Sequence, residues 1–156
     1  MVIAGITEFI LGNTFPFVVF IIYGSHWVNI GYVLDPLHNV VGSYTTGELP
    51  GALSQAYNSS QGNYNVVMAL VTFIFLIGSL RTNGPFVVVF FCLVFLFSFL
   101  AAAYYQLGYN ATAAGLEHAF YYFKIAGGFG FVTMICGWYV YHSLSRSVLL
   151  RWEGLS

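Results

Sequence analysis

The stretch that decides the fold lies at residues 85–107 and has the sequence PFVVVFFCLVFLFSFLAAAYYQL. It contains no charged side chain. A helix needs about 20 mostly apolar residues to cross the ~30 Å hydrocarbon core of a bilayer, and this stretch is long enough. Proline is tolerated in the first turn of a helix, so Pro85 is consistent with a helix that starts there. The stretch therefore predicts a membrane-spanning helix.

The composition of the whole chain agrees with a membrane environment. Only nine of the 156 residues are charged, four Lys or Arg and five Asp or Glu, while hydrophobic residues make up 59%. A soluble globular domain carries about 25% charged residues, so this chain lacks the charge to cover a water-facing surface. The net charge of −1 provides no basic patch, and nucleic acid is excluded as a partner.

Three other stretches are long and apolar enough to span a membrane, residues 14–34, 62–80 and 118–145. Residues 35–61 are rich in Gly, Ser, Asn, Thr and Pro, which indicates an aqueous loop. Residues 1–11 are apolar but about half the length of a span. We therefore predict an all-α integral membrane protein, with one transmembrane domain over residues 1–156. This domain is a bundle of four full transmembrane helices plus a partial N-terminal helix.

The basic residues predict the orientation of the chain. Arg81 lies between the second and third spans, and Arg146 and Arg151 follow the fourth. Cytoplasmic segments carry an excess of Lys and Arg, so we expect a cytoplasmic C-terminus and an extracellular loop at residues 35–61. Two Asn-x-Ser/Thr sequons fall on the outer side and are candidate N-glycosylation sites, Asn58 and Asn110.

The sequence lacks the residue patterns of an enzyme or a metal site. The histidines, at positions 26, 38, 118 and 142, form no pair at the spacing that binds a metal on a helix, and a His-Glu-x-x-His motif is absent. We expect these histidines at the membrane interface, and Cys92 and Cys136 as apolar packing residues. We therefore predict no catalytic residues, no metal and no cofactor.

Three residues in apolar surroundings have both a functional and a structural interpretation. Glu8 lies near membrane depth, where a carboxylate faces either a protein interior or the interface. Lys124 either extends its amine toward water, which we favour, or supplies positive charge to an anion. Leu93 belongs to a stripe on one helical face, which is either ordinary packing or a hydrophobic constriction. The members of this stripe are Phe86, Phe90, Leu93 and Phe97.

Specific motifs resemble one transporter family. Residues 8–15 (EFILGNTF) and 23–27 (YGSHW) closely resemble motifs of the acetate-uptake-transporter or YaaH family of bacteria and fungi. Residues 126–131 (AGGFGF) and 137–139 (GWY) resemble its last helix in the fungal form. Members have six transmembrane helices and assemble as hexamers with a pore through each protomer, so the resemblance implies a homo-oligomer of this kind. It also places the start of this chain near the end of the family's second helix, as expected of a truncated member.

The resemblance assigns roles to individual positions. It implies that Tyr23 and Leu93 form the narrow constriction of the substrate path, and that Asn13 and Thr14 form a polar turn on this path. It implies a path-lining small residue at Gly137. Glu8 matches an acidic residue of the second helix and is the candidate for proton coupling.

The function implied is that of a permease in the plasma membrane. Its substrates would be acetate or other short-chain monocarboxylates moved together with protons, and fungal relatives are also linked to ammonium export. The alternative is a truncated, non-transporting membrane subunit with a regulatory or assembly role. The sequence itself leaves both open.

Overall fold

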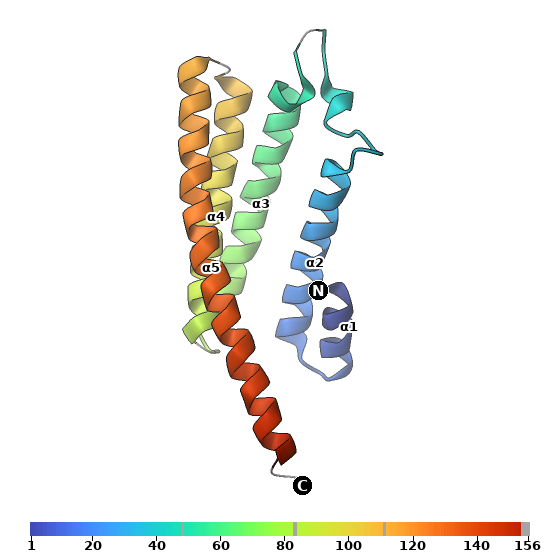
Figure 1. Cartoon of the computed structure of the whole chain (residues 1–156), viewed down its shortest axis with the longest axis vertical. Coiled ribbons are helices and arrows are strands. Elements are labelled where there is room, and N and C mark those ends of the chain that lie inside the picture. Colours follow the sequence, from blue (N-terminus) through green and yellow to red (C-terminus); the bar gives the residue numbers. More distant parts are fainter. Residues whose placement is uncertain (48, 83, 111, 154–156) are drawn as a thin grey trace. The chain divides into compact units, whose positions relative to one another are not determined.

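The fold is helical throughout the part of the chain that the structure describes. The computed structural model describes residues 1–47, 49–82, 84–110 and 112–153, with side chains up to Tyr139 and at His142. It contains five α-helices and two 3-10 turns in this part (Figure 1). The helices are α1 (Val2–Ile10), α2 (Thr14–Leu34), α3 (Gln55–Ser79), α4 (Gly84–Tyr109) and α5 (Ala113–Glu153), and the turns are η1 (Gly42–Tyr44) and η2 (Gly51–Leu53).

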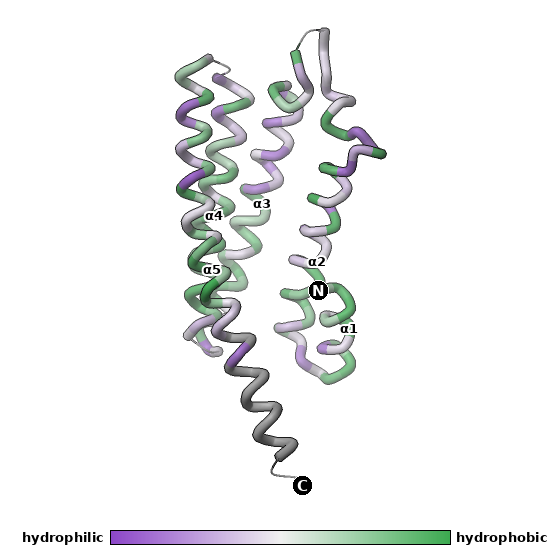
Figure 2. Tube along the Cα trace, in the orientation of Figure 1, coloured by the Kyte–Doolittle hydropathy of each residue, from purple (hydrophilic) through white to green (hydrophobic). Residues whose placement is uncertain are grey.

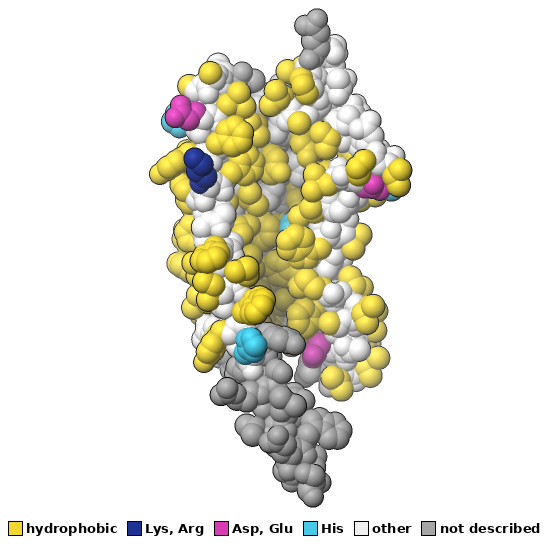
Figure 3. Space-filling view, in the orientation of Figure 1, with side chains coloured by type: hydrophobic (Ala, Val, Ile, Leu, Met, Phe, Trp, Pro, Cys, Tyr) yellow, Lys and Arg dark blue, Asp and Glu magenta, His cyan; other side chains and the backbone are white. Residues whose placement is uncertain are grey.

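The predicted class, an all-α membrane bundle, is confirmed. Four helical segments are long and apolar enough to cross a membrane, Thr14–Leu34, Gln55–Ser79, Gly84–Tyr109 and Ala113–Tyr139. Figure 2 shows hydrophobic residues along all of these helices, with hydrophilic residues of α3 gathered toward its N-terminal end. Hydrophobic side chains also dominate the face shown in Figure 3, where charged side chains are isolated. This is the surface expected of a protein whose solvent is lipid.

The chain divides into two compact units, and the first covers Met1–Tyr57. In it, α1 folds back on α2 through a short turn in which Gly12 has φ of +79°. The rings of Phe9 and Phe17 lie 5.0 Å apart across this hairpin. Near its other end, a Cβ added at Gly24 would lie 3.0 Å from the backbone nitrogen of Val2, so a small residue is needed there. Helix α1 is therefore too short to span a membrane but is packed along α2.

The second unit covers Asn58–Ser156, and in it α4 packs against α5 mainly through aromatic rings. Phe129 of α5 stacks on Phe95 at 5.2 Å and on Phe99 at 5.9 Å, and Tyr104 meets Phe123 edge to face at 5.5 Å. Small residues bring the two helices close. They include Ala103, Ala119 and Ala126, each at most 3% exposed.

Helix α4 also contacts α3. The rings of Phe75 and Phe90 lie 6.0 Å apart, and the Tyr105 hydroxyl donates a hydrogen bond to Asn63 Oδ1 at 2.5 Å. A Cβ at Gly62 would come within 2.8 Å of the Tyr105 ring, so the absence of a side chain there lets the ring approach α3. Close approach through small residues is the usual way in which helices associate in lipid.

The boundary predicted between the loop and α3 is wrong. The loop expected at residues 35–61 ends at Ser54, and α3 begins at Gln55 rather than at residue 62. Ser54 has an extended backbone (φ −62°, ψ 133°), which marks the end of η2. The polar composition of residues 55–61 is typical of a loop, but in the helix one polar member of this run, Asn58, lies fully buried.

Helix α5 also begins earlier than the predicted residue 118. It starts at Ala113 because Thr112 caps it: the Thr112 hydroxyl oxygen accepts a hydrogen bond from the Gly115 backbone N–H at 3.2 Å. The helix continues to Glu153, beyond the predicted end at residue 145. The polar residues near position 110 therefore form a turn of only a few residues between α4 and α5.

Thiol labelling tests the predicted orientation. Leu37 is 92% exposed in the loop after α2, and Thr82 is exposed in the turn after α3, next to Arg81. With Cys92 and Cys136 replaced by alanine, we expect Leu37→Cys to react with a membrane-impermeant maleimide in intact cells. Thr82→Cys should react only after permeabilisation, because arginine-bearing turns stay in the cytoplasm. Labelling of the second variant alone in intact cells would contradict the orientation.

Candidate functional site

The polar turn between α1 and α2 brings two of the predicted site residues together. Asn13 Nδ2 donates a hydrogen bond to Glu8 Oε2 at 2.7 Å, and the Asn13 backbone N–H donates to the Glu8 carbonyl oxygen at 2.9 Å. Glu8 is half-buried, whereas Asn13 and Thr14 are exposed. The Glu8 carboxylate is thus held at the end of α1 by the residue that leads into α2.

Tyr23 lies on the side of α2 opposite to α1. The residues of α2 that contact α1 include Phe17 and Gly24, whereas Val19, Tyr23 and His26 follow one another at helical spacing on the other side. Tyr23 and His26 are each only 7% exposed. His26, which we expected at the membrane interface, is buried near the middle of this candidate spanning helix.

Leu93 belongs to a stripe of α4 that is turned toward α3. Phe90 of this stripe contacts Phe75 of α3 and stacks on Phe86 at a ring distance of 6.4 Å. Phe90 and Phe97 are buried, and Leu93 between them is half-buried. The stripe therefore lies inside the helical packing for most of its length. Tyr23 is in the first unit and Leu93 in the second.

A buried row of polar residues on α3 was missed in the sequence. The four members recur at intervals of seven residues, and each is at most 5% exposed, Asn58, Asn65, Thr72 and Ser79. Seven residues are close to two helical turns, so the row keeps to one face. Gly62 and Phe75, which flank the row on either side, both contact α4. The seven-residue spacing was the signal that could have revealed the row.

Three side chains of this row donate hydrogen bonds to their own helix. The bonds run to carbonyl oxygens three or four residues earlier: Asn65 Nδ2 to Gln61 at 2.8 Å, Thr72 Oγ1 to Met68 at 2.7 Å and Ser79 Oγ to Leu76 at 2.7 Å. Such bonds satisfy a side-chain donor within a membrane helix.

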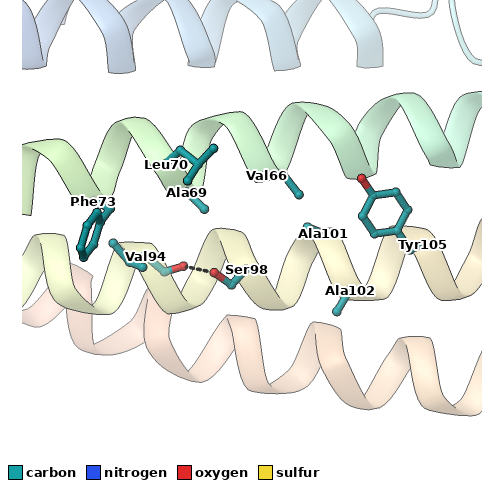
Figure 4. Close-up of a pocket in the computed structure, with 9 residues that line it drawn as sticks. All are labelled: Val66, Ala69, Leu70, Phe73, Val94, Ser98, Ala101, Ala102 and Tyr105. Atoms are coloured by element: carbon teal, nitrogen blue, oxygen red, sulfur yellow. Dashed lines mark hydrogen bonds between the residues drawn. The ribbon is translucent and has the colours of Figure 1, made fainter.

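An apolar groove of about 460 Å³ runs beside this row along the α3–α4 interface (Figure 4). Its walls include Val66, Ala69, Leu70 and Phe73 of α3 and Ser98 and Tyr105 of α4. The Ser98 hydroxyl donates to the Val94 carbonyl at 2.8 Å, so this hydrogen too bonds within its helix. None of the residues that the resemblance assigned to the path lines this groove.

The remaining predicted positions lie on α5. Among the described residues, no atom outside the neighbouring backbone of α5 comes within 4 Å of the place that a Cβ would take at Gly137. Lys124 is exposed and lines a shallow depression with Glu117, Phe120 and Tyr121. The structure therefore shows open space at Gly137, and the Lys124 side chain lies on the surface of the described helices.

The two sequons differ in their surroundings. Asn58 is fully buried in the first turn of α3, which conflicts with its prediction as a glycosylation site, because a sequon carries no information about burial. Asn110 lies in the α4–α5 turn, where its Oδ1 accepts a hydrogen bond from the Thr112 hydroxyl at 2.8 Å. In the described part of the chain, no group of three His, Cys, Asp or Glu side chains could hold a metal ion.

Comparison with curated proteins finds relatives in fungi. The chain is 32% identical over 143 residues to "Protein alcS" of Aspergillus fumigatus, which covers 90% of this chain and 51% of that protein. It is 26% identical over 137 residues to "Ammonia transport outward protein 3" of Saccharomyces cerevisiae, covering 87% of this chain and 43% of the relative. A "Meiotically up-regulated gene 86 protein" of Schizosaccharomyces pombe is 26% identical over 137 residues, with 88% and 41% covered.

The chain thus spans about half the length of the curated relatives that it matches. No solved structure matches it significantly. The pattern of the GPR1/FUN34/yaaH family matches residues 1–146, which is nearly the whole sequence. The chain belongs to the GPR1/FUN34/yaaH family.

Proposed function

We propose that this chain acts as a plasma-membrane permease for acetate and other short-chain monocarboxylates, moved together with a proton. The observation that carries the proposal is the position of Leu93. It belongs to an apolar stripe in which Phe90 and Phe97 are buried, and Phe90 of this stripe contacts Phe75 of α3. A narrow apolar constriction inside a helical bundle is a common way to select a small solute.

The other proposed path residues fit a small carboxylic acid. Tyr23 brings a hydroxyl to a buried face of α2. Asn13 and Thr14 are exposed polar groups at the end of the same helix, where a solute would leave or reach water. Glu8, held by Asn13, is the proposed site of proton exchange, and Gly137 is a further proposed lining position. The permease would work as a homo-oligomer, a hexamer with a path in each protomer, and with its C-terminus in the cytoplasm.

Ammonium export is the second candidate function. It is favoured by the name of the yeast relative, "Ammonia transport outward protein 3". A third candidate, a membrane subunit with an assembly or regulatory role and no transport of its own, follows from the sequence analysis. Neither requires a catalytic residue or a cofactor.

Uptake in cells that lack their own acetate permeases separates these functions. Cells that express residues 1–156 should accumulate radiolabelled acetate faster than cells with an empty vector, and faster at acidic than at neutral pH. Release of ammonium without acetate uptake would favour the second candidate. The absence of both activities would favour the non-transporting subunit, provided that the chain is as abundant in the membrane as a functional relative.

Leu93→Ala tests the constriction. Shortening a side chain at the narrowest point should admit larger acids, so we expect uptake of butyrate relative to acetate to rise by about tenfold, the order of magnitude for a change of this size in an apolar site. Leu96→Ala is the matched control. Leu96 lies on the same helix and is half-buried, but it contacts Gly130 of α5. An equal change in both variants would remove Leu93 from the path.

Glu8→Gln tests the proposed proton exchange. Glutamine can still accept the hydrogen bond from Asn13 but cannot ionise, so we expect proton-coupled acetate uptake to fall several-fold at unchanged protein abundance. Glu8→Asp is the control, because it keeps an ionisable carboxyl at this position; its uptake should stay closer to that of the original chain. An equal loss in both variants would contradict a role of Glu8 in proton exchange.

A further inference from the structure

One face of α5 is not covered by α3 or α4, and near the start of the helix it carries charged and aromatic side chains. Glu117, Phe120, Tyr121 and Lys124 have the spacing of a single helical face. All four are exposed, and together they line a depression of about 610 Å³. Figure 3 shows acidic and basic side chains near the start of α5 with hydrophobic side chains beside them. We call these four residues the α5 cluster.

The two charges of the α5 cluster are unpaired within the described ranges of the chain. The ion pair found in these ranges joins His38 to Asp35, in the loop after α2. Glu117 and Lys124 lie seven positions apart, which corresponds to about 10 Å along a helix. Because Cα–Cβ bonds of a helix tilt toward its N-terminus, the stem of Lys124 leaves α5 in the direction of Glu117.

The position of Lys124 in the candidate span requires a partner for its charge. It lies eleven positions after Ala113, about 16 Å from the start of the segment Ala113–Tyr139. A bare charge inside the hydrocarbon core is costly, so the ammonium of an exposed lysine extends toward the interface. The anionic groups at that level of a bilayer are lipid phosphates, and an ammonium binds phosphate as a point charge.

An aromatic wall lies at the other end of the α5 cluster. Phe120 and Tyr121 are each 61% exposed. The ring of Tyr121 lies 6.2 Å from that of Tyr122, which stacks on Phe99 of α4 at 6.3 Å, so the wall is anchored to a second helix. Faces of aromatic rings attract cations, quaternary ammonium groups in particular, and the Glu117 carboxylate adds a negative charge beside them.

The order of the two charges along α5 matches a zwitterionic phospholipid. Its phosphate is joined to the glycerol and the acyl chains, and its ammonium group lies farther from the hydrocarbon. In the α5 cluster, Lys124 lies deeper in the candidate span than Glu117. The match holds on either side of the membrane, because it depends only on the distance from the end of the helix.

Room for an acyl chain follows directly after Lys124. No atom outside the neighbouring backbone of α5 comes within 4 Å of a Cβ placed at Gly127 or Gly128, among the residues that the structure describes. Phe131, which is 60% exposed, comes one turn later on this face. Close packing of a second helix requires small residues at the contact, and the α5 cluster has none. A flexible lipid chain fits below it.

We propose that the α5 cluster binds the headgroup of a zwitterionic glycerophospholipid. Lys124 pairs with the phosphate, while Glu117 and the rings of Phe120 and Tyr121 hold the ammonium group. One acyl chain then lies along the strip at Gly127 and Gly128. This site concerns the recognition of lipid, and it does not depend on which solute the chain transports.

Native mass spectrometry of the full chain in detergent, with added phosphatidylcholine, tests the site. We expect Lys124→Gln to lower the fraction of chains with a bound lipid by about threefold, the size expected for one exposed charge contact. Lys124→Arg keeps the charge and should restore binding. Arg81→Gln is the matched control, because Arg81 is also exposed but lies in the turn after α3. Equal losses in Lys124→Gln and Arg81→Gln, at unchanged helix content by circular dichroism, would overturn the proposal.

Phosphatidylglycerol, which has a phosphate but no cationic group, tests the role of Glu117. The original chain should bind it less than phosphatidylcholine. Glu117→Gln should lower binding of phosphatidylcholine and raise binding of phosphatidylglycerol, because it removes both an attraction and a repulsion. A parallel change for the two lipids would overturn the assignment of a zwitterionic headgroup.

Cross-linking in cell membranes tests whether protein covers this face instead. In a background with both native cysteines replaced by alanine, Tyr121→Cys should remain monomeric when disulfide formation is catalysed by copper phenanthroline. A lipid between neighbouring copies keeps these thiols apart. Conversion of most of this variant to a disulfide-linked dimer would show that a second copy occupies the face, and would overturn the lipid site.

Discussion

The structure depends on one constraint: in lipid, every polar group must find a partner inside the protein. Backbone hydrogen bonds meet this requirement for the main chain of each helix, and hydroxyl side chains within the helices meet it with bonds to backbone carbonyls. Thr72, Ser98 and Thr133 each return their hydrogen to the carbonyl four residues earlier. At the helix ends the same need is met by short side-chain contacts, such as Asn13 with Glu8 and Thr112 with Gly115.

Because hydrophobic burial does not drive association in lipid, the helices depend on close fit. Gly24 admits the backbone of Val2 in the first unit, and Gly62 admits the ring of Tyr105 in the second. On the other side of α4, stacked rings and alanines meet α5. Aromatic residues at these contacts provide most of the contact area between helices, and small residues allow the helix backbones to approach closely.

The sequence was sufficient for the class of fold and insufficient for its boundaries. Charge-free length identifies spans such as the one that contains Leu93, because the bilayer sets that length. Composition did not predict the helix at residues 55–61, since a polar run in a buried helix and a polar run in a loop contain the same residue types. The regular spacing of Asn58, Asn65, Thr72 and Ser79 was the evidence in the sequence that the helix includes this run. Burial of His26 and the bond between Glu8 and Asn13 depend on tertiary structure, which motifs alone do not give.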